Sequence, residues 1–348
     1  MDLYRKNRSV RCHGAGRFLI AAALLSVTLT GCRREAPVQL FGEAQGTYYS
    51  VQYYDRQRRN LQPQVDSLLD AFDRSASLWV DSSLLRRINA GETDSLDNVL
   101  LFLLSRSQEM MEYTDGAFDP RVGRLVQVWG FSFRQRQEPD SATIADLLRA
   151  AQGDIGWHGH HYRRQYNDTE LDFNAIAQGY ASDLVGKMLE VRYGIHNYIV
   201  DIGGEVVAHG TKPDGSLWRV GIERPAADSG STPVVQTAIA LRDASVVTSG
   251  SYRKYYERDG IRYSHTIDPT TGRPVQHSLL SVSVVESESW LADAMATAYM
   301  VMGLDRAKDF IATHPDGPGT AAVLFIYDDN GTLATYATPD FEQMTIKQ

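Results

Sequence analysis

Residues 197–207, NYIVDIGGEVV, decide the fold class of this 348-residue chain. Apolar and polar side chains alternate on either side of Gly203-Gly204, which predicts a strand, a tight turn and a second strand. The segment before it, residues 175–193, is predicted to be a helix that follows an Asp-Phe-Asn start. A helix is therefore followed by two strands that a turn joins directly.

The rest of the chain mixes the two element types in the same way. Apolar residues at helical spacing predict helices at residues 61–78, 95–113 and 292–302, and short β-rich runs predict strands at residues 46–51, 234–241, 245–248 and 278–285. Asp97 is placed to cap the second of these helices. Because helices and strands do not alternate regularly, we predict an α+β fold rather than a doubly wound α/β fold.

The N-terminus predicts an extracytoplasmic lipoprotein. Five basic residues precede the apolar run 18–29, which is too short to span a bilayer comfortably and ends at small residues, as in a signal peptide. Residues 29–32, Leu-Thr-Gly-Cys, resemble a bacterial lipobox, whose cysteine is lipidated and becomes the first residue of the mature chain. A plain signal peptide is the alternative, but Cys32 stands where the apolar run stops. We predict a signal peptide at 1–31, a tether at 32–40 and a domain at 41–348 in the periplasm.

Composition limits the classes of function. With 43% hydrophobic and 22% charged residues, the chain is ordinary globular material. Cleavage would remove Cys12, so the mature chain would have no internal disulfide. Cleavage would also remove five basic residues and one acidic residue, so the formal net charge would fall from −8 to −12. Such an acidic body argues against nucleic acid as a partner.

Five segments combine Gly, Asp and hydroxyl residues at high density. They are residues 114–131, 171–183, 201–205, 248–274 and 292–297. The chain has no GxGxxG after a strand, no GxxxxGK[ST], no HExxH and no GxSxG. Any phosphate-bearing ligand must therefore be held by a metal, by backbone N–H groups or by a local basic residue.

Two of these segments suggest chemistry by themselves. Asp293 and Thr297 are four residues apart on a predicted helix, so their oxygens share one face and suit a hard cation such as Mg²⁺. A helix-capping aspartate with a packed threonine is the alternative. His265 lies in a turn closed by Pro269 and could accept the proton of an attacking hydroxyl, with Asp268 orienting it. Taken alone, a histidine near a turn is more often structural.

Together, and in this order, the five segments resemble those of the ApbE family of FAD:protein FMN transferases, from about residue 42 to residue 303. Residues 114–120, Thr-Asp-Gly-Ala-Phe-Asp-Pro, and 265–269, His-Thr-Ile-Asp-Pro, match the family pattern nearly letter for letter. The resemblance implies a single T-fold-like domain of mixed helices and mainly antiparallel sheet. It also implies Mg²⁺ as cofactor, FAD as substrate, and transfer of FMN to a threonine of an acceptor flavoprotein with release of AMP.

The resemblance further implies roles for individual residues. The metal site would consist of Asp293, Thr297 and the backbone carbonyl of Ala175. His265 would be the general base, with Asp268 beside it. The FAD site would be lined by Trp79, Ala117, Phe118, Asp119, Asp172, Gln178 and Ile267.

The chain departs from the family pattern at three places, none of which removes a presumed metal or catalytic group. Gln178 stands where many members have Lys or Glu, Gln45 replaces a Met before Gly46-Thr47, and Asn174-Ala175 replaces a Gly-rich pair. The histidine-rich stretch 157–161 lacks a cysteine or carboxylate spaced to complete a zinc site, and it is interpreted as a surface hairpin.

Two other functions fit the same residues. An FAD pyrophosphatase would use the same metal site, with water as nucleophile, and release FMN and AMP. A lipoprotein that stores or delivers flavin would need no catalysis. For the transferase, the predicted partner is an acceptor with a Ser/Thr-Gly-Ala-Thr-like site, part of a membrane redox complex, and the lipid anchor would attach the enzyme to a membrane.

Overall fold

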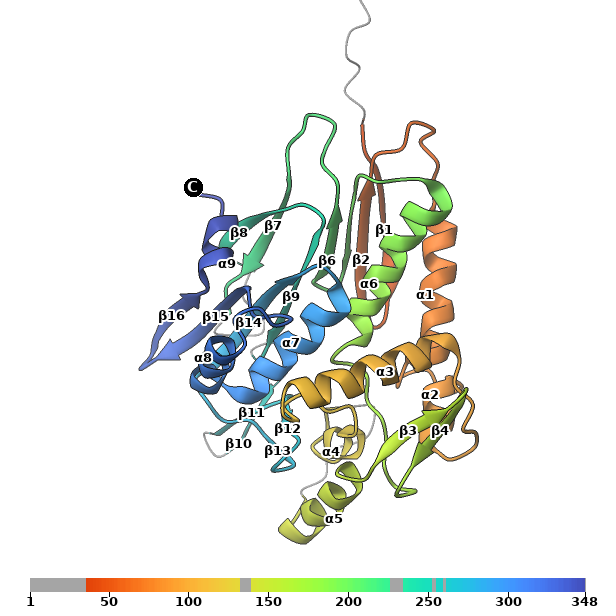
Figure 1. Ribbon diagram of the computed structural model, residues 1–348, viewed down its shortest axis with the longest axis vertical. Helices are drawn as coiled ribbons and strands as arrows, with labels where there is room; N and C mark the ends of the chain where they lie inside the picture. The colour runs from red at the N-terminus through yellow and green to blue at the C-terminus, as the bar shows by residue number, and fades with distance from the viewer. Residues whose placement is uncertain (1–35, 132–138, 226–233, 252–254, 259–260, 348) are drawn as a thin grey trace, which may run out of the picture. The chain divides into compact units, whose positions relative to one another are not determined.

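The computed structural model describes residues 36–131, 139–225, 234–251, 255–258 and 261–347 (Figure 1). The chain divides into two units, residues 1–35 and residues 36–348, and the described residues all belong to the second. The predicted signal peptide and Cys32 lie outside the described residues. No helix among the described residues is long and apolar enough to cross a membrane.

An eight-stranded sheet runs through the body, and each pair of neighbouring strands in it is antiparallel. In spatial order its strands are β1 (Val38–Ala44), β2 (Thr47–Tyr53), β5 (Tyr198–Ile202), β6 (Glu205–His209), β9 (Ala244–Gly250), β14 (Leu279–Glu286), β15 (Ala322–Asp329) and β16 (Thr332–Ala337). Shorter antiparallel pairs are β3 (Ile155–His158) with β4 (His161–Arg164), β7 (Trp218–Glu223) with β8 (Val235–Leu241), β10 (Tyr255–Arg258) with β11 (Ile261–Ser264), and β12 (Ile267–Asp268) with β13 (Arg273–Pro274).

Two tight turns in the sheet follow from the residues at them. Gln45 and Gly46, between β1 and β2, both have positive φ, as a two-residue hairpin of right-handed twist requires. Gly203 and Gly204 have φ of 66° and 115° and join β5 to β6. The predicted strand, turn and strand at residues 197–207 is therefore confirmed. The sheet begins at Val38, so the folded part starts three residues before the predicted boundary at 41.

In the described part of the chain, the α-helices are α1 (Gln62–Ala76), α2 (Leu84–Asn89), α3 (Asn98–Tyr113), α4 (Gly123–Val128), α5 (Ser141–Ala151), α6 (Ala177–Lys187), α7 (Ser289–Met302), α8 (Leu304–Thr313) and α9 (Pro339–Met344). Asp97 caps α3 as predicted, because its carboxylate accepts the amide hydrogen of Leu100 at 2.9 Å. The predicted helix at 175–193 is α6 followed by a π-helical turn, Met188–Arg192.

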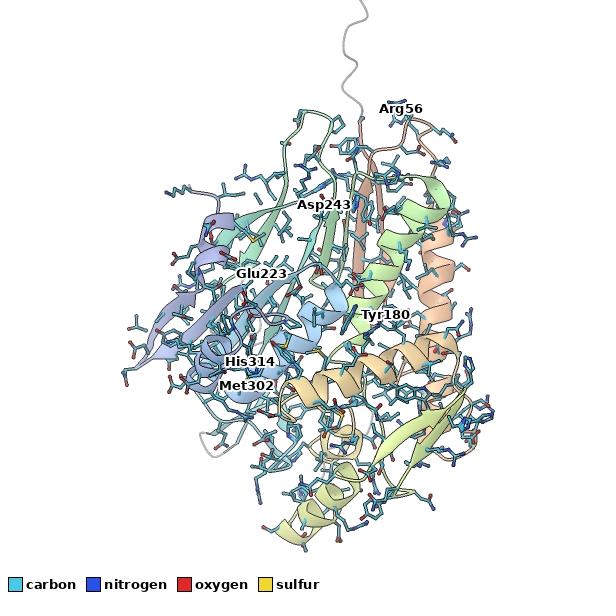
Figure 2. All side chains as sticks on the ribbon, viewed as in Figure 1. Arg56, Tyr180, Glu223, Asp243, Met302 and His314 are labelled. Atoms are coloured by element: carbon cyan, nitrogen blue, oxygen red, sulfur yellow. The ribbon has the colours of Figure 1, made fainter. Side chains whose placement is uncertain are left out.

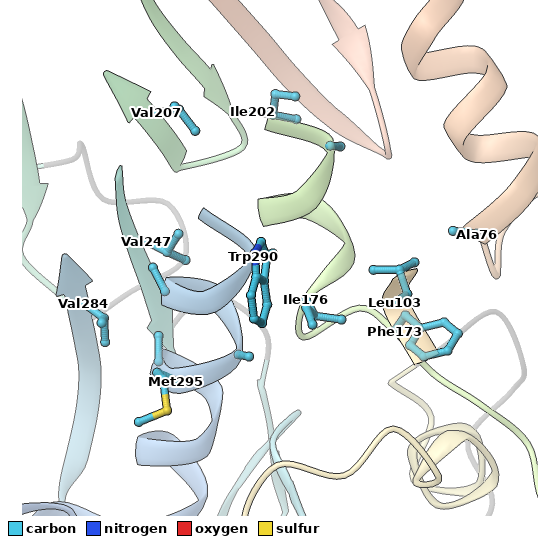
Figure 3. Close-up of a cluster of buried hydrophobic side chains, with 14 of the residues drawn as sticks. Ala76, Leu103, Phe173, Ile176, Ile202, Val207, Val247, Val284, Trp290 and Met295 are labelled. Carbon is cyan, nitrogen blue, oxygen red and sulfur yellow. The ribbon is translucent and has the colours of Figure 1, made fainter. Parts of the chain in front are cut away.

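Both faces of the sheet are covered. Helices α6 and α7 pack on one face, where strand residues such as Val207, Val247 and Val284 meet Trp290 and Met295 of α7 (Figure 3). The β7–β8 pair and α9 cover the other face with apolar side chains that include Trp218, Ile239 and Phe341. Val284 and Val285 are consecutive in β14 yet belong to opposite clusters, as the alternation of a strand requires. The α+β prediction is confirmed.

Two further contacts position the segments that matter for function. Tyr180 of α6, labelled in Figure 2, stacks on Phe102 of α3 with ring centroids 3.9 Å apart, which ties α3 to the start of α6. Helices α4 and α5 form a separate apolar cluster that includes Trp129 and Ile267. The Trp129 indole donates to the carbonyl of Gly272 at 2.8 Å, so this cluster anchors the turn that follows His265.

Candidate metal and flavin site

The central feature is a buried carboxylate where α6 and α7 meet. Asp293, in the second turn of α7, is 4% exposed, and its Oδ2 accepts the amide hydrogen of Gly179 in α6 at 3.1 Å. A Cβ on Gly179 would lie 2.4 Å from the carbonyl oxygen of Ser289, so only glycine lets the two backbones come this close. The close approach brings a charged oxygen of one helix onto the first turn of the other.

Two hydroxyl groups, those of Thr297 and Ser249, lie on the side of α7 from which the Asp293 carboxylate projects. Thr297 is one turn after Asp293 in α7, so the two side chains project in the same direction. The Thr297 hydroxyl lies 3.4 Å from the hydroxyl of Ser249 in β9. Ser249 was not among the predicted ligands, although it lies in the fourth of the polar segments. The site therefore extends from α7 to the sheet.

The third predicted ligand, the backbone carbonyl of Ala175, lies just before α6. The Gly179 amide, four residues later, donates to Asp293, and the Ala177 amide donates to the carbonyl of Phe173. Among the described residues, no hydrogen bond ends on the Ala175 carbonyl. A carboxylate, a hydroxyl and a backbone carbonyl are the oxygen donors that Mg²⁺ and Ca²⁺ take, so the residues present fit such a cation.

Burial changes the protonation of the two carboxyl groups at this helix contact. Burial raises the pKa of Asp293, although the amide of Gly179 lowers it, and nearby Asp183 adds a second raising effect. Burial also raises the pKa of Asp183. Without a compensating charge, these carboxyl groups would hold protons at a higher pH than ordinary aspartates. A divalent cation at Asp293 would favour the ionised form.

The first two polar segments of the sequence meet beside this site. The Asp172 amide donates to the carbonyl of Pro120 at 2.7 Å, which places Asp172 next to Asp119 along the paired backbones. Asp172 is buried, and desolvation raises the pKa of its carboxyl to about 6. The Asp119 carboxylate forms an ion pair with Arg121 at 2.7 Å, a pairing that was not predicted from the sequence.

Three of the predicted FAD-lining side chains belong to the apolar core. Ala117 and Phe118 are each 2% exposed and lie in the main cluster, and Ile267 is 5% exposed in the α4–α5 cluster. Such side chains have little surface for a ligand, although their backbones border the polar segments. Gln178, the neighbour of Gly179, donates to the carbonyl of Ile202 at 2.9 Å. Trp79 is 59% exposed.

His265 and Asp268 lie in the turn held by the α4–α5 cluster. His265 is half-buried, and its ring meets the ring of Phe131 edge-on at 6.4 Å. The Asp268 carboxylate accepts hydrogen bonds from the Thr270 amide and hydroxyl and from the Thr271 hydroxyl. These bonds fix the turn, whereas an orienting contact from Asp268 to His265 stays a prediction.

A pocket of about 380 Å³ opens beside the same turn. It is lined by Trp129, Asp268, Thr271, Arg273, Pro274, Val275 and Gln276. The stretch 157–161 forms the predicted hairpin, β3–β4, in which His161 contacts Asp94 at 3.0 Å. These histidines are thus part of a surface hairpin on another part of the fold.

Comparison with known proteins gives one consistent result. The ApbE family model matches residues 45–323. An FAD:protein FMN transferase of Vibrio cholerae is 36% identical over 343 residues, covering 95% of this chain and 99% of that protein, and one of Escherichia coli is 30% identical over 354 residues, covering 95% and 97%. The solved structure of the flavin transferase ApbE from Vibrio cholerae superposes with a TM-score of 0.77 at 30% identity, covering 89% of this chain and 99% of that one.

Proposed function

The chain belongs to the ApbE family, and from this premise we propose that it is a Mg²⁺-dependent FAD:protein FMN transferase. Its relatives are named for transferring FMN from FAD to a protein, and they match it over nearly their whole length. The observation that carries the proposal is the set of oxygen donors around the α6–α7 contact, with Asp293 buried at its centre. Such a set suits a cation that would bind the pyrophosphate of FAD.

In the proposed reaction, an acceptor threonine hydroxyl attacks the phosphorus on the FMN side of the FAD pyrophosphate. A new P–O bond to the threonine forms as the bond to the bridging oxygen breaks, and that oxygen leaves with AMP. The hydroxyl proton passes to His265. Mg²⁺ held by Asp293, Thr297 and the Ala175 carbonyl would neutralise charge on the phosphate oxygens. No covalent enzyme intermediate is needed, and positioning supplies much of the rate.

His265 suits the role of base because of how its turn is held. The turn is fixed by hydrogen bonds to Asp268 and by the indole of Trp129. A half-buried imidazole in a rigid turn loses little freedom when a hydroxyl docks against it. We propose that the main role of Asp268 is to hold this turn, and with it His265, in place.

The remaining predicted residues would bind FAD in two ways. Asp119, Asp172, Gln178 and Trp79 would use their side chains. Ala117, Phe118 and Ile267 would use their backbones, because their side chains are packed in the core. We also propose that Cys32 is lipidated and holds the enzyme at a membrane on the extracytoplasmic side. The acceptor would then be an extracytoplasmic flavoprotein, part of a membrane redox complex.

Mass spectrometry of the products tests the proposal against its alternatives. The mature chain is incubated with FAD, Mg²⁺ and an acceptor domain that has a Ser/Thr-Gly-Ala-Thr-like site. The transferase predicts one FMN adduct on the acceptor and an equal amount of AMP. FMN and AMP without an adduct would indicate a pyrophosphatase, and intact FAD that stays bound would indicate a flavin-binding lipoprotein.

A further inference from the structure

Helices α6 and α7 pack against each other (Figure 1). Two carboxylates join them, one from each helix, and each accepts from the backbone of the other helix. Asp293 of α7 accepts the amide hydrogen of Gly179 in the first turn of α6 at 3.1 Å. Asp183 of α6 accepts the amide hydrogens of Ser289 and Trp290 in the first turn of α7, at 2.9 and 3.0 Å. In each helix the amide donor and the carboxylate acceptor are one turn apart and face the same way. The four residues that form these bonds are Gly179, Asp183, Ser289 and Asp293.

Asp183 supplies the cap that α7 lacks in its own sequence. The first amides of a helix have no partner within it, and a side chain at the N-cap usually accepts from them. The N-cap residue of α7, Glu288, makes no such bond. Its carboxylate accepts from the indole of Trp290 instead, at 3.0 Å. The start of α7 is therefore held by a residue of another helix.

The start of α7 determines where Asp293 lies. Asp293 is four residues after Ser289, and at 1.5 Å of rise per residue any displacement of the first turn carries the carboxylate with it. The helices also touch backbone to backbone at Gly179, where a Cβ would lie 2.4 Å from the carbonyl oxygen of Ser289. No flexible side chain separates the two helices at this point to absorb a shift.

We propose that Asp183 is a positioning residue for the metal-binding carboxylate: it holds the first turn of α7 so that Asp293 meets the cation in a fixed place. Asp183 would not touch the cation itself. The inference rests on the proposed function, because it takes Asp293 as a metal ligand. A residue that only stabilised the fold would cap α7 without any effect on cation affinity. The two roles therefore differ in what happens to metal binding when the cap is lost.

The test titrates the purified mature chain with Mn²⁺ alone, without FAD or acceptor, and follows free Mn²⁺ by electron paramagnetic resonance. Asp183→Ala removes both acceptors, and Asp183→Asn keeps one. Groups that hold a metal ligand in place typically account for about 10–100-fold in affinity. We expect the dissociation constant to rise by that amount in Asp183→Ala and by less in Asp183→Asn. Saturating Mg²⁺ should restore most of the turnover number in both variants.

Asp97 offers a matched control, because it caps α3 through the Leu100 amide and also accepts from Ser75. Asp97→Ala should lower the melting temperature about as much as Asp183→Ala while leaving the Mn²⁺ dissociation constant within about twofold of the wild type. An unchanged constant in a folded Asp183→Ala protein would overturn the inference. If that variant does not fold, Asp183→Asn decides in the same way.

A third variant separates this inference from the proposed function. Asp293→Ala should bind Mn²⁺ far more weakly than either Asp183 variant. Should Asp293→Ala bind like the wild type, the proposed metal site and the role of Asp183 would both be rejected. If Asp183→Ala keeps the wild-type dissociation constant for Mn²⁺ while Asp293→Ala binds Mn²⁺ weakly, only the role of Asp183 would be rejected.

Discussion

The carboxylate of Asp293 accepts the amide hydrogen of Gly179 at 3.1 Å. The donor lies in the first turn of α6 and the acceptor in the second turn of α7, so this bond joins the two helices. Ala175 precedes Ile176, the N-cap residue of α6, so its carbonyl lies outside the helix. In the proposed function, the Asp293 carboxylate and the Ala175 carbonyl would both bind the cation.

The first prediction concerns the proposed ligands. Asp293→Ala should raise the Mg²⁺ concentration needed for activity by at least about 100-fold, because it removes the one charged group of the three. Thr297→Ala should have a smaller effect, since water replaces a neutral oxygen more easily. The measurement is transfer rate against Mg²⁺ concentration. Asp305→Asn, on the exposed side of α8, serves as control and should behave like the wild type. Normal Mg²⁺ dependence in Asp293→Ala would place the metal elsewhere.

The second prediction concerns the general base. His265→Ala should bind FAD nearly as well as the wild type yet transfer FMN about 10²–10⁴ times more slowly, because a base acts on the nucleophile. The loss of rate toward acid pH that a histidine produces should also disappear. His161→Ala, in the exposed β3–β4 hairpin, is the control and should keep full activity. Equal rates for His265→Ala and the wild type at neutral pH would make His265 a structural residue.

The third prediction follows from burial of Asp172, which raises the pKa of its carboxyl from 3.8 to about 6. The folded protein holds this proton to higher pH than the unfolded chain, so its stabilising effect is present below about pH 4 and is lost as the pH rises through 6. Asp172→Asn keeps an oxygen for the amide of Asn174 and carries no charge. It should be more stable than the wild type by up to about 3 kcal/mol at pH 8 and equally stable at pH 3.5.

Urea unfolding at several pH values, without metal or FAD, measures this difference. The same variant should bind FAD more weakly if Asp172 contacts the ligand, a familiar conflict between stability and function. The exposed Asp305→Asn variant provides the baseline. If the difference in unfolding free energy between Asp172→Asn and the wild type is the same at pH 3.5 and pH 8, burial does not raise the pKa of Asp172.

Much of the fold could be predicted because local signals there agree with tertiary structure. The glycine pair at 203–204 allows positive φ, and Asp97 can cap α3, so both features were predicted from a few residues. The short helices α4 and α5 and the strands β15 and β16 were not predicted. Two of the site's features also escaped prediction, because they depend on contacts between distant segments. Ser249 is 48 residues from Thr297, and Asp183 caps a helix 106 residues later.

For residues in the core, the sequence could not predict which part of the residue faces a ligand. A motif match places Phe118 and Ile267 in a ligand-binding segment, but it does not say whether the side chain or the backbone faces the ligand. Both side chains pack inward, at 2% and 5% exposure. The polar neighbours Asp119 and Asp268 each have a partner within the chain, Arg121 and Thr270 respectively. Which groups are free for a ligand follows from packing, which the motif does not contain.

The fourth prediction concerns the N-terminus. Replacement of Cys32 by Ser should release the protein from membranes into the soluble extracytoplasmic fraction, because the thiol that carries the lipid is gone. The measurement is the partition of the protein between membrane and soluble fractions. Purified Cys32→Ser protein should keep the wild-type transfer rate, since the predicted tether separates residue 32 from the domain. Unchanged membrane attachment would contradict the lipoprotein prediction.

The fifth prediction concerns which protein receives the flavin. The family resemblance implies an acceptor threonine in a Ser/Thr-Gly-Ala-Thr-like stretch, and the nearest counterpart here is Thr248-Ser249-Gly250-Ser251. That stretch lies at the end of β9, where Thr248 and Ser249 hydroxyls contact Ser283 and Thr297. Both hydroxyls are engaged within the fold, and the sequence lacks the Ala-Thr ending. The enzyme should therefore modify another protein and not itself.

Intact-mass measurement decides between self-modification and transfer. The mature chain with FAD and Mg²⁺ alone should keep its mass, and an added acceptor domain should gain one FMN. Changing the acceptor threonine to alanine should abolish that gain, while Thr248→Ala in the enzyme should leave it in place, because Thr248 would only lose its contact with Ser283. Stoichiometric FMN on the enzyme, absent in Thr248→Ala, would instead identify a self-modified flavoprotein whose acceptor site is the end of β9.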